Sequence, residues 1–277
     1  MRSCSKAVLL VIDGLRPDAI GPETMPTLSE LRERFWSAAG AVTVRPSVTV
    51  AALSSLATGV SPSTHGLIEP GLSSLGALRS VQPLPQHLRR YRRATTVVTS
   101  DLPGSALLVA RTLLGLAGVG RVETSGATPA EVAAGGLRAV GRPEDGLTII
   151  YLNDTDRAGH AYGWMSASYL EAAARADGAV AILAELAERD EILLVVTADH
   201  GGGGVAPNDH DAPHPVNDAI PLILAGPAIR RGARSNRAAA LLDIPPTILH
   251  ALGVPIPPAY EGRVLAEAFQ KEAALVA

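Results

Sequence analysis

Short apolar runs alternate with helical patterns along the whole chain. Continuous apolar runs predict buried strands at residues 7–14, 94–101, 147–156, 191–201 and 219–229. Apolar residues at helical spacing predict helices at 25–38, 48–59, 168–190 and 237–253, the last interrupted by two prolines. Strands that alternate with helices predict an α/β fold, with a doubly wound, mostly parallel sheet and helices on both faces.

The segment from about residue 67 to residue 143 is less regular and richer in Gly, Ser and Pro. We expect it to hold one strand of the main sheet and small insertions that face the substrate. No repeat and no linker divides the chain, and 277 residues can build one core. The prediction is a single α/β domain over residues 1–277.

Composition excludes several classes of protein. With 47% hydrophobic and 18% charged residues, the chain is not disordered, and a net charge of −3 argues against nucleic acid as a partner. Cys4 is the only cysteine, which excludes an internal disulfide and fits a reducing compartment. The first apolar run, 7–12, ends in Asp13 and predicts a core strand rather than a signal peptide. We therefore expect a cytoplasmic protein with no membrane partner.

Acidic and histidine side chains lie at the ends of three predicted strands and in the loop that leads into a fourth, at the edge where functional groups of such sheets collect. Three aspartates and three histidines would suit two divalent metal ions. Each residue alone also has a structural explanation as a turn or a cap. The candidates are Asp13, Asp156, His160, Asp199 and His200, with His210 or His214 from the loop before residue 219.

Thr49 is the candidate nucleophile. It lies where a loop enters a helix, so its hydroxyl can face free backbone N–H groups and the positive end of the helix dipole. The alternative is an N-cap, a role for which Ser47 or Thr49 would serve equally well.

Five stretches, in this order, resemble the alkaline phosphatase superfamily, and most closely its type I phosphodiesterase/nucleotide pyrophosphatase branch. They are VIDGLRPD, PSVTVAALSSLATGVSPSTHG, YLNDTDRAGHAYG, VVTADHGGGG and LLDIPPTILHALGVPIPPAYEGRVL. The resemblance implies a two-metal hydrolase of small phosphate esters in which Thr49 takes the phosphoryl group. The metal that it implies is zinc. It assigns Asp13, Asp199 and His200 to the metal that activates Thr49. Asp156, His160 and a third histidine would hold the other metal.

The third histidine is not decided by the resemblance. The superfamily's spacing to the following strand favours His210, whereas some branches use a spacing nearer to that of His214. His214 precedes a proline, so it could instead stiffen the loop or orient a ligand from the pocket rim.

Other residues have structural interpretations. His65 lies in a family motif without being a ligand there, and Asp177, Asp243 and Thr247 are expected to cap or pack helices. The basic cluster at 87–94 could meet an anionic substrate but is more typical of a solvated helix face.

The chain departs from the family pattern at Ala52. Many phosphodiesterases of this family carry Asn there, and its amide donates to a phosphate oxygen. The open alternatives are therefore a phosphonate hydrolase, a phosphomonoesterase, and a non-catalytic relative that binds metal or phosphate. A sulfatase is disfavoured because the modified Cys or Ser of that branch is replaced by Thr49. A mutase is disfavoured because its large inserted domain has no room here.

Overall fold

The computed structural model describes residues 4–69, 81–189 and 191–270. Its centre is an eight-stranded sheet in which, among the strands described, only β9 runs against the others. In spatial order the strands are β10 (Arg234–Ser235), β2 (Trp36–Ala38), β9 (Leu222–Ala225), β7 (Ile192–Thr197), β1 (Lys6–Ile12), β6 (Asp145–Leu152), β4 (Ala94–Thr99) and β5 (Arg121–Thr124). This confirms the doubly wound, mostly parallel sheet.

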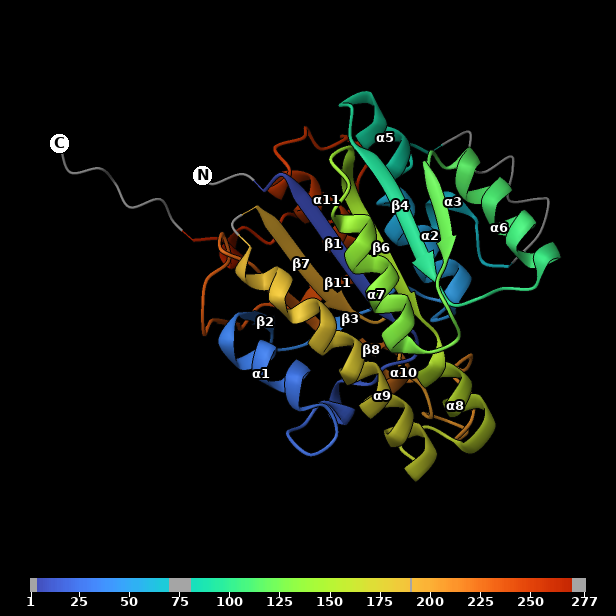
Figure 1. Ribbon diagram of the computed structural model, residues 1–277. Coiled ribbons are helices and arrows are strands. Elements are labelled where there is room, and N and C mark those ends of the chain that lie inside the picture. Colours follow the sequence, from blue (N-terminus) through green and yellow to red (C-terminus); the bar gives the residue numbers. More distant parts are fainter. Residues whose placement is uncertain (1–3, 70–80, 190, 271–277) are drawn as a thin grey trace.

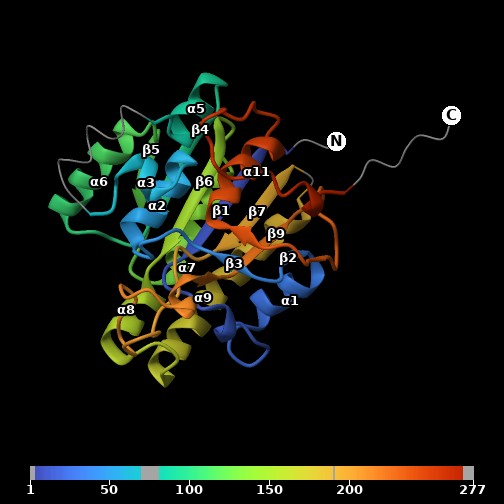
Figure 2. The same ribbon diagram turned by 180° about the vertical axis from the view of Figure 1, so that it is seen from behind.

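A smaller sheet lies beside the β2–β9 end of the main sheet. Its three strands are, in spatial order, β11 (Ala239–Ala240), β3 (Ala41–Val42) and β8 (Ala219–Ile220). Short connections carry the chain between the two sheets from β2 to β3, from β8 to β9 and from β10 to β11. Figure 2 shows β2, β3 and β9 around this junction.

Helices cover both faces of the main sheet. In Figure 1 helices α7 and α9 lie in front of the strands, and Figure 2 shows α2 and α11 on the opposite face. The helices are α1 (Pro26–Arg34), α2 (Thr49–Thr58), α3 (Pro62–His65), α5 (Leu84–Arg90), α6 (Gly104–Leu116), α7 (Pro129–Val140), α8 (Asp154–Tyr162), α9 (Ala167–Ala184), α10 (Pro215–Asp218) and α11 (Ile244–Ala251). Short 3-10 turns are η1 (Pro17–Ala19), η2 (Glu185–Glu188), η3 (Leu241–Asp243) and η4 (Ala266–Ala268).

The core explains why the apolar runs are continuous. Every residue of β7 is buried, and so are six of the seven residues of β1, because helices cover both faces of these strands. Among the described residues, none of the helices combines the length and the apolar character needed to cross a membrane.

Three predicted elements differ from the structure at prolines and aromatic residues. The predicted helix 25–38 ends at Arg34, because Trp36–Ala38 pairs with β9 as strand β2. Pro221, which has no N–H to donate, separates the predicted strand 219–229 into β8 and β9. The two prolines of the predicted helix 237–253 lie in the first turn of α11. Backbone N–H groups of a first turn make no hydrogen bond within the helix, so proline is tolerated there, and the helix begins at Ile244 rather than at residue 237.

The segment 67–143 is more regular than predicted. It contributes two strands of the main sheet, β4 and β5, rather than one, together with α5, α6 and α7. Residues 70–80 of this segment lie outside the described residues. That the segment faces the substrate stays a prediction.

Candidate metal centre and active site

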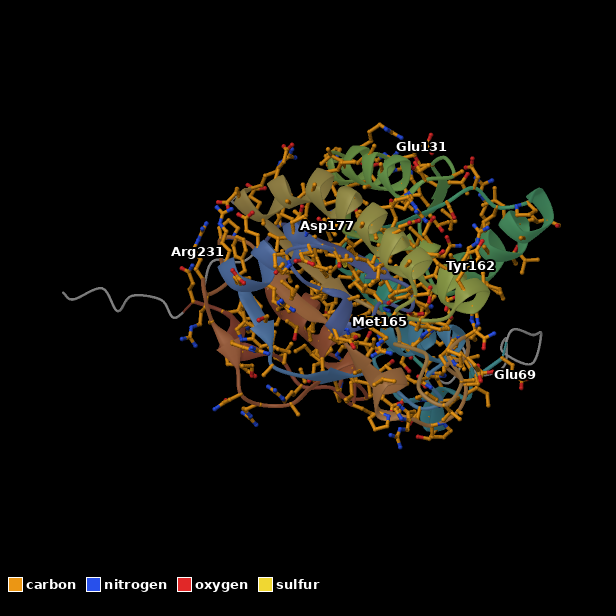
Figure 3. All side chains as sticks on the ribbon, turned by 90° about the horizontal axis from the view of Figure 1, so that it is seen from below. Glu69, Glu131, Tyr162, Met165, Asp177 and Arg231 are labelled. Atoms are coloured by element: carbon orange, nitrogen blue, oxygen red, sulfur yellow. The ribbon has the colours of Figure 1, made fainter. Side chains whose placement is uncertain are left out.

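Three neighbouring central strands bring the predicted carboxylates together. Asp13 directly follows β1, Asp199 comes two residues after β7, and Asp156 lies in α8 just after β6. Since β1 pairs with β7 on one side and with β6 on the other, all three chain ends meet at the same edge of the sheet. In Figure 3, Tyr162 and Met165 mark the chain between α8 and α9, which continues from this edge.

A first cluster forms around His200. Its Nε2 atom lies 3.3 Å from Asp13 Oδ1, 3.6 Å from Asp199 Oδ2 and 3.1 Å from Thr49 Oγ1. Asp13, Asp199 and His200 are all buried, and their ligand atoms are close enough together to share one ion. The structure thus brings together the three residues predicted for one metal and places the Thr49 hydroxyl against them.

A second cluster adjoins the first. Asp156 Oδ1 lies 3.5 Å from His160 Nε2 and 3.9 Å from His210 Nε2. The His210 ring also stacks on the His200 ring, with centroids 3.9 Å apart, so the two clusters are in direct contact. Asp156 and His160 lie one turn apart on helix α8; the predicted strand 147–156 ends earlier, at Leu152.

All three histidines hold their rings in the same way. In each of them Nδ1 contacts a backbone carbonyl oxygen, to which it donates, so the neutral ring keeps its Nε2 lone pair free. The contacts are His160 to Asn208 (3.1 Å), His200 to Gly201 (2.8 Å) and His210 to Ser47 (2.9 Å). The Nε2 atoms are those nearest the carboxylates, which is the orientation of metal-ligating histidines, and His200 Nε2 also contacts the Thr49 hydroxyl.

The carboxylates themselves fit a cation. Asp13 Oδ1, Asp156 Oδ1 and Asp199 Oδ2 are buried and, within the described part of the chain, have no hydrogen-bond partner. Burial, with the nearby charges of Asp199 and Asp156, raises the pKa of Asp13 well above its ordinary value. Burial of an unpaired carboxylate is costly, and two divalent ions would satisfy these oxygens, one at Asp13 and Asp199 and the other at Asp156. The residues present therefore fit the implied metals.

Thr49 does not cap its helix. It is the first residue of α2, and the N-cap is Val48, which makes no side-chain cap. Its hydroxyl is instead directed to His200. The free N–H groups of the first helical turn lie at the same place. Ala52 is fully buried in the core, and its methyl group has no hydrogen-bond donor for a substrate.

His214 plays a different part from His210. Its Nδ1 accepts a hydrogen bond from Val216 N (3.3 Å) and caps α10. In the described residues it belongs to neither group of possible metal ligands and has no contact with Asp156. His160 also lies outside both groups and is half-exposed, but its Nε2 is 3.5 Å from Asp156 Oδ1. The geometry therefore favours His210 as the third histidine.

The residues expected to be structural have the predicted roles. His65 is buried and uses both ring nitrogens, with Ser55 Oγ (2.9 Å) and Leu67 N (2.9 Å). Asp177, labelled in Figure 3, accepts from Leu28 N (2.8 Å) and so caps α1. The remaining two bind backbone N–H groups: Asp243 accepts from Ala240 N and Arg263 N, and Thr247 from Leu265 N. In the basic cluster, Arg93 is tied to carbonyl oxygens of Ser5 and Leu252.

Sequence reasoning missed the side chains that support the ligands. Tyr151 donates its hydroxyl to Asp13 Oδ2, and desolvation raises the pKa of Tyr151, which keeps the proton in place. Trp164 Nε1 and Tyr169 Oη donate to Gly14 O at 2.8 and 2.9 Å, which fixes the turn after Asp13.

Trp164 also forms a wall of the second cluster. Its ring meets those of His160 and His210 edge-on, with centroids 5.1 and 5.7 Å apart. An added Cβ at Gly159, Gly202 or Gly203 would come within 2.1–2.7 Å of this side chain. These glycines, two of them in the GGGG run, were the only sign in the sequence of a bulky neighbour.

Comparisons with known proteins agree with this site. A family model described as type I phosphodiesterase/nucleotide pyrophosphatase matches residues 7–72, which include Asp13 and Thr49. A second, the metalloenzyme superfamily, matches residues 124–256, which include the other predicted ligands.

Curated relatives match over parts of their length. A 2,3-bisphosphoglycerate-independent phosphoglycerate mutase of Cereibacter sphaeroides is 32% identical over 136 residues, 48% of this chain and 26% of the mutase. A putative extracellular sulfatase Sulf-1 homolog of Caenorhabditis elegans is 33% identical over 89 residues, 31% of this chain and 13% of that protein. The chain thus spans about a quarter or less of the length of these relatives.

Among solved structures, human ectonucleotide pyrophosphatase/phosphodiesterase 5 has a similar fold. The TM-score is 0.74 at 12% identity, and the match covers 96% of this chain and 100% of the human chain. The two family models lie on the two halves of one site, and the fold agrees with both. The chain therefore has an alkaline phosphatase-like fold, and its sequence is similar to the metalloenzyme superfamily over residues 124–256 and to type I phosphodiesterases/nucleotide pyrophosphatases over residues 7–72.

Proposed function

We propose that this chain is a two-metal phosphohydrolase that cleaves small phosphodiesters, or related phosphate esters and phosphonates, through a phosphothreonine at Thr49. Asp13, Asp199 and His200 would hold one ion, and a second group would hold the other: Asp156, His160 and His210. Divalent ions, with zinc the best match to this carboxylate and imidazole set, lower the pKa of a bound hydroxyl or water and neutralise phosphate charge.

The chain's own groups account for the remaining steps. The Thr49 oxygen attacks phosphorus, and the P–O bond to the leaving alcohol breaks as the bond to Oγ1 forms; the alcohol takes up the hydroxyl proton. N–H groups of the first turn of α2 would donate to the non-bridging oxygens and so replace the donor absent at Ala52. Water then cleaves the phosphothreonine and restores the hydroxyl.

One observation carries this proposal. Three buried carboxylate oxygens without hydrogen-bond partners and the free Nε2 atoms of the histidines face one another, and the Thr49 hydroxyl lies 3.1 Å from one of those nitrogens. Ordinary core packing satisfies such oxygens. A site that binds metal without catalysis would explain the carboxylates and the histidines, but it would not require a hydroxyl at the helix terminus.

Turnover of a chromogenic phosphodiester, bis(p-nitrophenyl) phosphate, by zinc-reconstituted protein tests the proposal. We expect close to two metal ions per chain by elemental analysis, release of p-nitrophenol, and loss of both after chelation. Metal binding without turnover of any diester, monoester or phosphonate would refute the catalytic part. A stoichiometry of zero would refute the metal site itself.

A further inference from the structure

A cavity of about 240 Å³ lies at the junction of the two sheets, apart from the candidate metal centre. Its walls are the β2–β3 connection, the β8–β9 connection and the start of the segment after Asp13, and none of the predicted site residues lines it. The run Ala38–Ala41 has only Ala and Gly side chains, which leaves space where the strands separate. Ile220, Leu222 and Ile223 make the opposite wall apolar.

Two arginines stand at this cavity. Arg32 of α1 and Arg234 of β10 line it and also a neighbouring hollow of about 380 Å³. In the described residues neither guanidinium has a hydrogen bond or an ion pair, although Arg32 is partly buried. Arg34 and Arg231 on the same side both bind Glu188, at 2.6 and 3.0 Å, and Figure 3 labels Arg231 at this edge of the molecule.

The charges at this place favour a monoanion. Glu33 lines the neighbouring hollow, so the two guanidinium groups and one carboxylate leave a formal charge of about +1. A guanidinium binds a carboxylate through two parallel N–H···O bonds, and a partly buried one without a partner gains most from such a ligand. The remaining surface of the cavity is largely hydrocarbon and would cover an apolar body.

We propose that this cavity binds a small carboxylate with a short hydrocarbon body, held between Arg32 and Arg234. Its volume lies just below the range of about 300–1,000 Å³ that is usual for ligand pockets, which limits the body to a few carbon atoms. The inference does not rest on the proposed hydrolase activity, since it concerns a site apart from the metal ligands.

Isothermal titration of zinc-loaded protein with sodium hexanoate tests the proposal, with hexan-1-ol as the uncharged control. The titration is repeated with metal-free protein, in which hexanoate cannot bind through zinc, and the same stoichiometry and affinity are expected. We expect one hexanoate per chain and, because hydrogen bonds to a charged group are lost, at least about tenfold weaker binding of hexanol.

The variant Arg32→Gln/Arg234→Gln should weaken hexanoate binding by about tenfold or more. Arg237→Gln is the matched control: Arg237 lies in the same segment, outside the cavity lining, and its loss should leave binding unchanged. Absence of saturable binding, equal affinity for hexanol, or unchanged affinity in the double variant would each overturn the proposal.

Discussion

Replacing Gly202 by alanine should destabilise the protein through one defined contact. The new Cβ would lie 2.1 Å from the Trp164 ring, far inside van der Waals contact, while the backbone of Gly202 is not in the left-handed region that strains alanine. Trp164 cannot easily move, because its Nε1 is bonded to Gly14 O and its ring lies against His160 and His210.

The magnitude follows from the cost of overpacking a core, which is about 1–3 kcal/mol. A 2.1 Å approach to a fixed ring belongs at the upper end, about 3 kcal/mol. For a domain of this size that amount lowers the melting temperature by roughly 6–12 °C. Displacement of Trp164 should also weaken metal binding at Asp156 and the two histidines.

Thermal unfolding of the metal-free and zinc-loaded proteins, followed by circular dichroism, measures the effect. Gly178→Ala provides the control, since Gly178 lies within α9 and its added Cβ meets nothing within 4 Å. That change should raise stability by up to about 1 kcal/mol, as alanine is the better helix former. A melting temperature of Gly202→Ala within a degree or so of wild type would refute the role given to Trp164.

The remaining predictions concern the metal site. Thr49→Ala should lower turnover of bis(p-nitrophenyl) phosphate by about 10³-fold or more with metal content kept, and Thr49→Ser should retain part of the rate; near-wild-type kinetics in the alanine variant would exclude the phosphothreonine. His210→Ala should cost one metal equivalent by elemental analysis, and His214→Ala only rate or affinity; the reverse pattern would exchange their roles. Tyr151→Phe should weaken zinc binding about 10–100-fold in a chelator competition, because the hydrogen bond to a ligand carboxylate is lost, and unchanged affinity would contradict this. With Ala52 in place of Asn, kcat/KM should be higher for an aryl diester or phosphonate than for the monoester dianion, and a preference for the monoester would contradict it.

That the predicted ligands lie close together could be predicted from the sequence, because these residues follow the ends of strands. Asp13 and Asp199 each follow an apolar run, and parallel strands deliver such residues to one edge of the sheet whatever the details of packing. The sequence did not favour the geometry of His210 over that of His214, because the orientation of the His210 ring depends on a contact with Ser47 O, far away in the chain.

Supporting residues were beyond the sequence pattern for a related reason. Tyr151 reaches Asp13 only because β6 pairs with β1 in a register that sets it opposite Val11. No local pattern fixes that register. The prediction that the helix continues to residue 38 was wrong for the same reason. Phe35 and Trp36 continue the helical spacing of apolar residues, but both are buried and Trp36 pairs with β9, which overrides that spacing.

The position of Trp164 gives the protein an optical reporter of its own metal content. The chain has two tryptophans, and the other, Trp36, is buried in the core between β9 and β10. An ion bound by His160 and His210 would bring a charge close to the Trp164 ring, which meets both imidazoles edge-on, and a nearby charge alters the emission of an indole. Filling of the second cluster should therefore change the emission of Trp164 while Trp36 supplies a constant background, so that loading can be followed by fluorescence without substrate.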